Sequence, residues 1–381
     1  MFIKTKSCRI PKQMDISNNI NTKVEEISSS GSLATSQSDR WLFSFTIDLS
    51  VFLGSAVVSL LLLWIGACVG VLYDDSPDWA WIGAVLLIDV AHVHATWYKV
   101  YFDTEEIKRR LYLYVLVPVI GYVIGVALYS ESALLFWRVL AYLAVFHFVR
   151  QQYGWVALYR AKLNDKNQIG KWIDTSAIYL ATIYPLVYWH ANLPRNFAWF
   201  VQSDFASLPS IILKILTPVY WIVMFVYAAR SLYGWVIKRE GNIGKDIVVI
   251  TTAVCWYVGI VVFNSDYAFT VTNVIIHGVP YFALIYWYSK TRRETANKPY
   301  RLLTSNLFGF LLLLWLIAYA EEFFWHRGVW HEREWMFGQH WDWTNLKTFL
   351  VPLLALPQLT HYVLDGFIWR RKNNPDFKLV R

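Results

Sequence analysis

The chain has 381 residues, of which 56% are hydrophobic, 18% are aromatic and 16% are charged. A soluble domain of this length normally carries fewer apolar and more charged residues. The formal net charge is +8, but the lysines and arginines stand in short segments beside apolar runs, which argues against a nucleic-acid-binding face. The composition therefore indicates a multi-pass integral membrane protein, which we expect in a bacterial cytoplasmic membrane.

Cysteine usage excludes two further classes of protein. The three cysteines, Cys8, Cys68 and Cys255, are scattered and show no CxxC spacing. Neither a disulfide framework nor a thiolate metal site is indicated. Any metal must therefore be bound by nitrogen and oxygen ligands.

The chain divides into three parts by composition. Residues 1–40 are polar, rich in Asn, Ser and Thr, and predict a disordered cytoplasmic tail. Residues 41–370 hold the apolar runs and predict a transmembrane helical domain. Residues 371–381 predict a basic cytoplasmic tail.

The apolar runs predict the fold class. A helix needs roughly 20 apolar residues to cross a hydrocarbon core of about 30 Å, and unpaired backbone groups are costly in lipid. We therefore expect an all-α fold, a polytopic transmembrane helix bundle with both termini cytoplasmic. Ten spans are predicted, at residues 45–73, 79–101, 111–129, 133–159, 172–189, 211–237, 247–263, 267–288, 302–324 and 349–369.

Charges in the predicted loops give the orientation. Alternate loops carry most of the basic residues, including Lys99, Arg160, Lys245 and Lys290, whereas the intervening loops are acidic or nearly uncharged. Cytoplasmic loops are the ones enriched in Lys and Arg. The even-numbered spans are therefore expected to run from the outside toward the cytoplasm.

Four of these co-directional spans carry a histidine inside an apolar run, namely His92, His147, His277 and His361. Counted from the basic residues that follow each span, their depths differ by about 9 Å or less at 1.5 Å of rise per residue, which helix tilt largely absorbs. A lone histidine in a span is usually a satisfied hydrogen-bond donor. Four on co-directional spans instead favour a shared metal or cofactor centre, because ionisable groups in lipid are expensive.

Helical spacing selects the neighbours of these histidines. Asp89 lies one turn from His92, and Asp365 lies one turn from His361, as residues three or four apart share a face. Each aspartate is either a ligand or the acceptor for the second ring N–H of a ligating histidine. His94 points about 200° from His92, so both bind one metal only on a distorted helix, and a two-metal site is the alternative.

Imidazole and carboxylate ligands without thiolate suit iron, manganese or zinc. We expect iron (Fe²⁺/Fe³⁺), because open positions on such a ligand set are where non-haem oxygenases bind O₂. The predicted metal ligands are drawn from His92, His94, His147, His277, His361, Asp89 and Asp365.

Three further polar residues share faces with the histidines. Arg150, Gln151 and Tyr281 are predicted to orient the substrate or an oxygen intermediate. Arg150 lies about ten residues inside the membrane and needs either a water-filled cavity or an anionic partner, namely Asp365, Asp89 or a substrate headgroup, unless it snorkels to the surface. Glu321 and Glu322 stand at the outer end of the ninth span, where we expect them to reach water.

The pattern of single histidines on several spans, with aspartates nearby, resembles the membrane-embedded non-haem iron dioxygenases that cleave carotenoids and accompany microbial rhodopsins. His92, His147, His277 and His361 carry the likeness, which covers no continuous segment. If these histidines correspond, the resemblance implies β-carotene as the substrate. The chain lacks the HxxxH and HxxHH boxes of fatty-acid desaturases, so it does not resemble that family.

The sequence thus predicts an integral-membrane, metal-dependent oxygenase or desaturase that acts on a lipid, isoprenoid or carotenoid and uses an electron donor as a partner. One alternative is a haem-binding electron carrier or haem-modifying protein with paired axial histidines. Another is a transporter coupled to protons or metal ions. Motifs for nucleotide binding, serine hydrolases and zincins are absent from the sequence.

Overall fold

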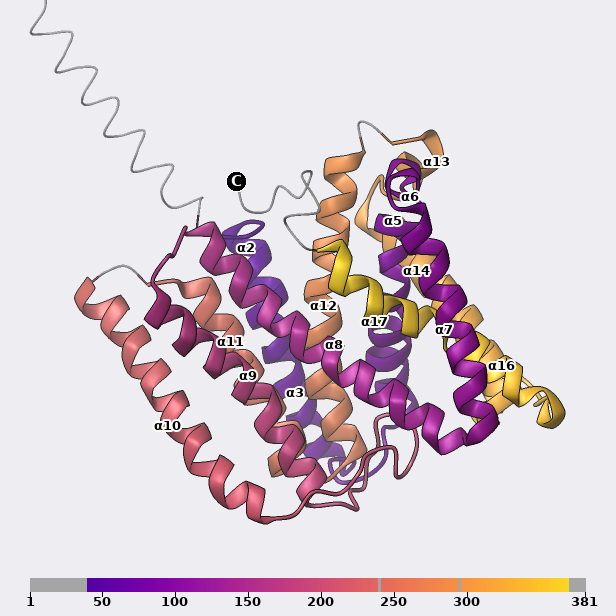
Figure 1. The fold of residues 1–381 in the computed structure, drawn as a ribbon, viewed down its shortest axis with the longest axis horizontal. Helices are drawn as coiled ribbons and strands as arrows, with labels where there is room; N and C mark the ends of the chain where they lie inside the picture. Colours follow the sequence, from indigo (N-terminus) through magenta and orange to yellow (C-terminus); the bar gives the residue numbers. More distant parts are fainter. Residues whose placement is uncertain (1–39, 239–240, 294–295, 370–381) are drawn as a thin grey trace, which may run out of the picture. The chain divides into compact units, whose positions relative to one another are not determined.

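The computed structural model describes residues 40–238, 241–293 and 296–369. Every regular element in these ranges is helical, as the sequence predicted, and none is a strand (Figure 1). The described residues from Trp41 to Trp369 belong to one compact unit. The predicted tails, 1–40 and 371–381, lie outside the described residues except for Arg40.

In chain order the elements are α2 (Phe45–Asp48), η1 (Leu49–Gly54), α3 (Ser55–Val69), α4 (Asp78–Ala80), η2 (Trp81–Val90), α5 (Ala91–Val100), α6 (Thr104–Arg109), α7 (Leu111–Glu131), α8 (Ala133–Lys162), α9 (Gln168–Ala191), α10 (Ile211–Tyr233), η3 (Gly234–Lys238), α11 (Ile243–Trp256), η4 (Tyr257–Val262), α12 (Asp266–Arg292), α13 (Lys298–Leu303), α14 (Leu307–Trp325), η5 (His326–Trp330), α15 (Glu334–Phe337), η6 (Thr344–Leu346), α16 (Lys347–Leu354) and α17 (Leu356–Ile368).

Eight helical segments of the described chain are long and apolar enough to cross a membrane. They match eight of the ten predicted spans. The fifth predicted span is a continuous helix, α9, with 24 residues, but the charged and polar side chains near its start, including Lys171 and Asp174, lower its hydropathy. The eight segments are Phe45–Val69, Asp78–Val100, Leu111–Glu131, Ala133–Lys162, Ile211–Lys238, Ile243–Val262, Asp266–Arg292 and Leu307–Trp330.

The tenth predicted span is wrong as a single helix. The chain breaks at Ala355 into α16, of 8 residues, and α17, of 13 residues. Pro357 stands at the start of α17, where a proline is tolerated because the first N–H groups of a helix have no intrahelical partner. Pro352 lies inside α16, where its missing N–H weakens the helix. The histidine of this region therefore lies on a short, separate helix.

Helix α12 is the centre of the bundle. In its most apolar window 83% of the residues are buried, against 11% for α7 and 11% for α10, which lie at the rim. It packs against α3, η2, α5, α8 and α11. A residue on α12 is therefore within reach of side chains from several other helices.

The helices that carry the four histidines run in the same direction. His92 on α5 contacts His277 on α12, and seven residues further along α5 the Lys99 Nζ atom lies 3.9 Å from the ring centre of Tyr288 on α12. The same amine lies 5.3 Å from the ring of Trp369, just after α17. Helices α5, α8, α12 and α17 all end toward the same side of the bundle, where α6 and α13 lie (Figure 1).

Several basic residues that the sequence assigned to loops are buried in helices. Lys99 and Lys245 are 2% and 4% exposed, and Arg160 is also buried. Lys245 on α11 and Arg230 on α10 each contact Asp174 of α9 at 2.8 Å, and Arg160 of α8 is ion-paired with the same carboxylate. Asp174 thereby joins four helices at one end of the bundle.

A second carboxylate ties the end of α5 to the end of α12. Asp103 is the N-cap residue of α6, and its side chain accepts hydrogen bonds from the Glu105 and Glu106 N–H groups. It also accepts hydrogen bonds from Arg292 Nε and the Tyr288 hydroxyl, at 2.9 Å each. Burial raises the pKa of Asp103, but these hydrogen bonds and the Arg292 charge outweigh it and hold that pKa below its usual value. The carboxylate is therefore ionised near neutral pH.

Candidate metal centre

The structure brings His92, His147, His277 and His361 together. One ring nitrogen from each lies within 4.8 Å of the corresponding nitrogens of the others, and all four side chains are buried. They come from four separate helices, α5, α8, α12 and α17. Among the described residues this is the one group of three or more His, Cys, Asp or Glu side chains placed so that it could hold a metal ion.

The four imidazoles form a closed ring of edge-to-face neighbours. The centroid separations are 4.8 Å for His92 and His277, 5.0 Å for His277 and His147, 4.4 Å for His147 and His361, and 5.0 Å for His361 and His92. The Nε2 atoms of His92 and His277 are 3.1 Å apart. The Nε2 atoms of His147 and His361 are buried without a hydrogen-bond partner. Their lone pairs are therefore available to bind a metal ion.

These distances fit a single ion. A metal bound to imidazole nitrogens at about 2.1 Å in tetrahedral geometry separates those nitrogens by about 3.4 Å. The nitrogens here are 4.8 Å apart at most. The four nitrogens are thus at most about 1.4 Å further apart than a tetrahedral ion requires.

A hydrogen-bond chain sets the tautomer of His361. The Tyr281 hydroxyl donates to Asp365 at 2.7 Å, so its oxygen accepts from Thr96, whose hydroxyl lies 2.8 Å away. Thr96 in turn accepts the Nδ1 proton of His361 at 2.7 Å. Each member donates to the next, and the chain ends on a carboxylate. The Nε2 lone pair of His361 is left for a metal.

The two aspartates lie beside the histidines and not among the four nitrogens. Asp89 is 3.6 Å from His92 Nδ1, and Asp365 is 3.8 Å from the Nδ1 atoms of both His147 and His361. These contacts are longer than hydrogen bonds, but they place negative charge beside the second nitrogen of three rings. This is the arrangement of a carboxylate that supports a ligating histidine.

Local packing explains why the rings can meet. A Cβ atom on Gly278, next to His277, would lie 2.6 Å from Ile88 Cγ2 and 3.3 Å from the Ile88 carbonyl oxygen. Glycine therefore allows α12 to approach η2 closely at the site. On the other side, the Phe148 ring stacks on His277 with centroids 3.5 Å apart and an interplanar angle of 8°, which fixes the plane of that imidazole.

His94 does not join the other histidines. Its Nε2 atom lies 2.6 Å from Glu321 of α14, and the other oxygen of Glu321 accepts from Trp325 Nε1. α5 is regular at this point, so His94 faces away from His92 as helical geometry requires. The expectation that Glu321 and Glu322 reach water is wrong, since both are buried, and Glu322 pairs with His326 at 3.3 Å.

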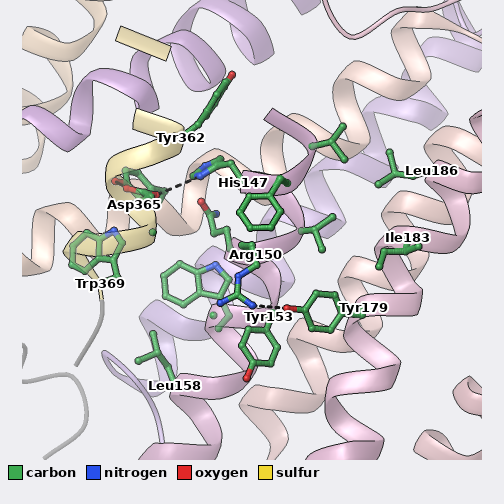
Figure 2. A pocket seen from close by; sticks show the side chains of 18 of the residues that line it. His147, Arg150, Tyr153, Leu158, Tyr179, Ile183, Leu186, Tyr362, Asp365 and Trp369 are labelled. Carbon is green, nitrogen blue, oxygen red and sulfur yellow. Dashed lines mark hydrogen bonds and ion pairs between the residues drawn. The ribbon is translucent and has the colours of Figure 1, made fainter. Parts of the chain in front are cut away.

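Arg150, Gln151, Tyr281 and Asp365 line an apolar cavity of about 750 Å³ that the metal centre borders through His147. His147, Tyr281 and Asp365 form the wall nearest the metal centre. Arg150 lines the cavity and donates to the Tyr179 hydroxyl. Figure 2 shows Arg150 directed to Tyr179, while Asp365 is directed to His147. The cavity size is typical of a small-molecule site.

Gln151 lines the cavity and also bonds to the backbone of α12. Its Nε2 atom donates to the His277 carbonyl oxygen at 2.8 Å, linking α8 to α12.

Sequence reasoning missed the stacking of Phe148, the His94–Glu321 pair and the hydrogen bonds of Thr96, although Thr96 stands one turn after His92. Helical spacing places Thr96 on the same face as His92, but only the packing of neighbouring helices reveals its partners.

Comparisons with known proteins add no assignment. No family model matches the chain, and neither the curated proteins nor the solved structures gave a match. The resemblance to carotenoid-cleaving dioxygenases therefore stays a prediction. The function has to be argued from the site itself.

Proposed function

We propose that the protein is an integral-membrane, non-haem iron oxygenase or desaturase that acts on a lipid or isoprenoid. One observation carries this proposal. Four buried histidines from four helices place nitrogens within 4.8 Å of one another, and one of them, His147, lines an apolar cavity of about 750 Å³. A nitrogen-only site beside an apolar cavity combines a metal position with room for a hydrophobic substrate.

Each part of the site has a role in this function. Iron, when bound, supplies the activation of O₂. The imidazoles of His92, His147, His277 and His361 would hold the ion, while Thr96 accepts the Nδ1 proton of His361 and the carboxyl groups of Asp89 and Asp365 lie beside the second nitrogens of His92, His147 and His361. The apolar cavity excludes water from the reacting atoms, and Gln151 fixes the backbone beside His277.

The stoichiometry of the reaction determines the partners. Insertion of one oxygen atom into a C–H bond leaves the second as water, and desaturation leaves both as water. Either reaction consumes two external electrons with O₂, so an electron donor is required. Cleavage of a double bond that places both oxygen atoms in the products requires none.

The geometry favours an ion over haem. Two axial histidines must stand on opposite faces of a macrocycle, which needs an open slab of space between their rings. Here the His92 and His277 Nε2 atoms are 3.1 Å apart, and every neighbouring pair of rings is in edge-to-face contact. A porphyrin does not fit between such rings.

The first test is elemental analysis of detergent-purified protein. We expect about one iron per chain and no Soret band, with iron lost on His→Ala substitution at 92, 147, 277 or 361. His190→Ala is the matched control, because His190 is also buried but both its nitrogens have partners, the Leu186 carbonyl and the Tyr142 hydroxyl. Iron retained in all four variants, or lost equally in His190→Ala, would overturn the assignment of the centre.

The second test is turnover under ¹⁸O₂. Protein reconstituted with a total lipid extract and ascorbate as reductant is expected to give a product that has gained one or two ¹⁸O atoms or lost two hydrogens, read by mass spectrometry. The His277→Ala variant is expected to give none. An iron-loaded protein that converts no lipid or isoprenoid would argue against an oxygenase.

A further inference from the structure

Arg150 has no carboxylate partner among the described residues, although it lies near the middle of α8 in a segment apolar enough to cross a membrane. Its contacts there are the Tyr179 hydroxyl and the face of Tyr153, 4.9 Å from its guanidinium carbon. A guanidinium in lipid is expensive without an anion. Tyrosine contacts orient the group but leave its charge uncompensated.

The nearest acidic side chain in the cavity is already engaged. Asp365 accepts from Tyr281 and lies 3.8 Å from the Nδ1 atoms of His147 and His361. It forms no ion pair with Arg150, and Figure 2 shows the two side chains directed to different partners. Arg150 is the one arginine or lysine that lines this cavity, and its side chain is exposed, so the anionic group of a bound molecule can reach it.

The cavity is elongated along α8. Its lining on this helix extends from Tyr142 to Leu158, which at 1.5 Å per residue is about 24 Å. Helices α9 and α17 both pack on α8 and wall the cavity. The rest of the lining is mainly apolar and includes Val145, Phe146 and Leu284.

The charge and the shape together define the occupant. A planar guanidinium binds carboxylate or phosphate oxygens with two parallel hydrogen bonds, and the long apolar lining suits one hydrocarbon chain. Arg150 stands one helical turn from His147, so atoms near such a head lie beside the metal centre. We propose that the cavity binds a single-chain amphiphile whose anionic head is held by Arg150 and whose chain lies along α8 past His147. This names the substrate class of the proposed enzyme and rests on that proposal.

The test is photolabelling in nanodiscs with a palmitic acid that carries a mid-chain diazirine. We expect mass spectrometry to map the label to peptides of α8, α9 and α17. Palmitate and hexadecyl phosphate should compete, and their relative strength identifies the head as carboxylate or phosphate. Hexadecanol, with the same chain and no charge, should not compete. Equal competition by hexadecanol, or label that maps elsewhere, would overturn the proposal.

Variants of two arginines on α8 sharpen the test. Arg150→Gln should weaken palmitate binding about tenfold or more, because it removes charge-assisted hydrogen bonds, and Arg150→Lys should weaken it less. Arg138→Gln is the control, since Arg138 is half-buried, donates to the Ser203 carbonyl and does not line the cavity. Unchanged binding in Arg150→Gln would refute the role of this residue.

Iron measured on the same samples separates this inference from the proposed function. Arg150→Gln should keep the iron of the wild type while losing palmitate selectivity. Protein that binds palmitate selectively without iron would support the amphiphile site and contradict the metal enzyme. Protein that holds iron but labels equally with charged and uncharged chains would contradict the amphiphile site alone.

Discussion

At the scale of single residues, the site depends on which nitrogen of each imidazole carries a proton. His361 has its Nδ1 proton placed by Thr96, which is itself fixed by Tyr281 and Asp365. Partners of this kind orient a ligating histidine and raise its basicity. His277 has no such partner for Nδ1, and the stacked Phe148 ring holds it by its face instead. The four histidines are therefore held by different means.

Thr96→Val tests this chain. Valine keeps the shape of threonine but cannot accept the His361 proton, so we expect iron affinity to fall about 10- to 100-fold. The measurement is competition for iron against a chelator of known affinity. The iron-free variant should unfold at nearly the same temperature as the iron-free wild type.

Thr360→Val is the matched control for that experiment. Thr360 is also buried and stands next to His361, but its hydroxyl donates to the Leu356 and Pro357 carbonyls of its own helix. It should leave iron affinity unchanged. Equal losses in the two variants would mean that packing, and not the proton on His361, accounts for the effect.

At the scale of elements, close approach of helices decides whether the ligands meet. α12 is buried along most of its length, and Gly278 lets it lie against η2 just before the α5 segment that carries His92. π-helical turns such as those of η2 often occur at functional sites. The break at Ala355 has the same kind of effect, because a short α17 can tilt independently of α16 to direct His361 inward.

Gly278→Ala is expected to destabilise the protein by about 1–3 kcal/mol, the usual cost of overpacking. Its Cβ would lie 2.6 Å from Ile88 Cγ2. Gly83→Ala, on η2, has nothing within 4 Å of the added atom and should be neutral or slightly stabilising through helix propensity. Thermal unfolding in detergent gives both values. A Gly278→Ala midpoint at or above that of Gly83→Ala would contradict the close approach.

At the scale of the whole molecule, one end of the bundle is held together by buried ion pairs. Asp174 is fully buried and joins α8, α9, α10 and α11 through Arg160, Arg230 and Lys245. Removal of one partner from a buried pair leaves an uncompensated charge. These contacts lie far along the helices from the histidines, so they belong to stability and not to the site.

Asp174→Asn should therefore lower the free energy of unfolding by about 3 kcal/mol or more, with iron per folded chain unchanged. Asp165→Asn is the control, because the Asp165 side chain is 28% exposed and Arg160 keeps Asp174 when it is replaced. It should shift the thermal midpoint little. Equal shifts in the two variants would show that the four-helix junction contributes nothing beyond a surface pair.

The sequence alone determined the helical class and the four histidines that meet, because apolar run length and the 1.5 Å rise per residue set the depth of a side chain in a span. Depth does not set the direction in which a side chain points once helices pack. The tertiary structure decided that His94 pairs with Glu321, that the last span is broken, that Lys99 and Lys245 are buried, and that Arg150 faces a cavity without an acidic partner. Each of these depends on contacts between helices distant in the chain, which no local pattern records.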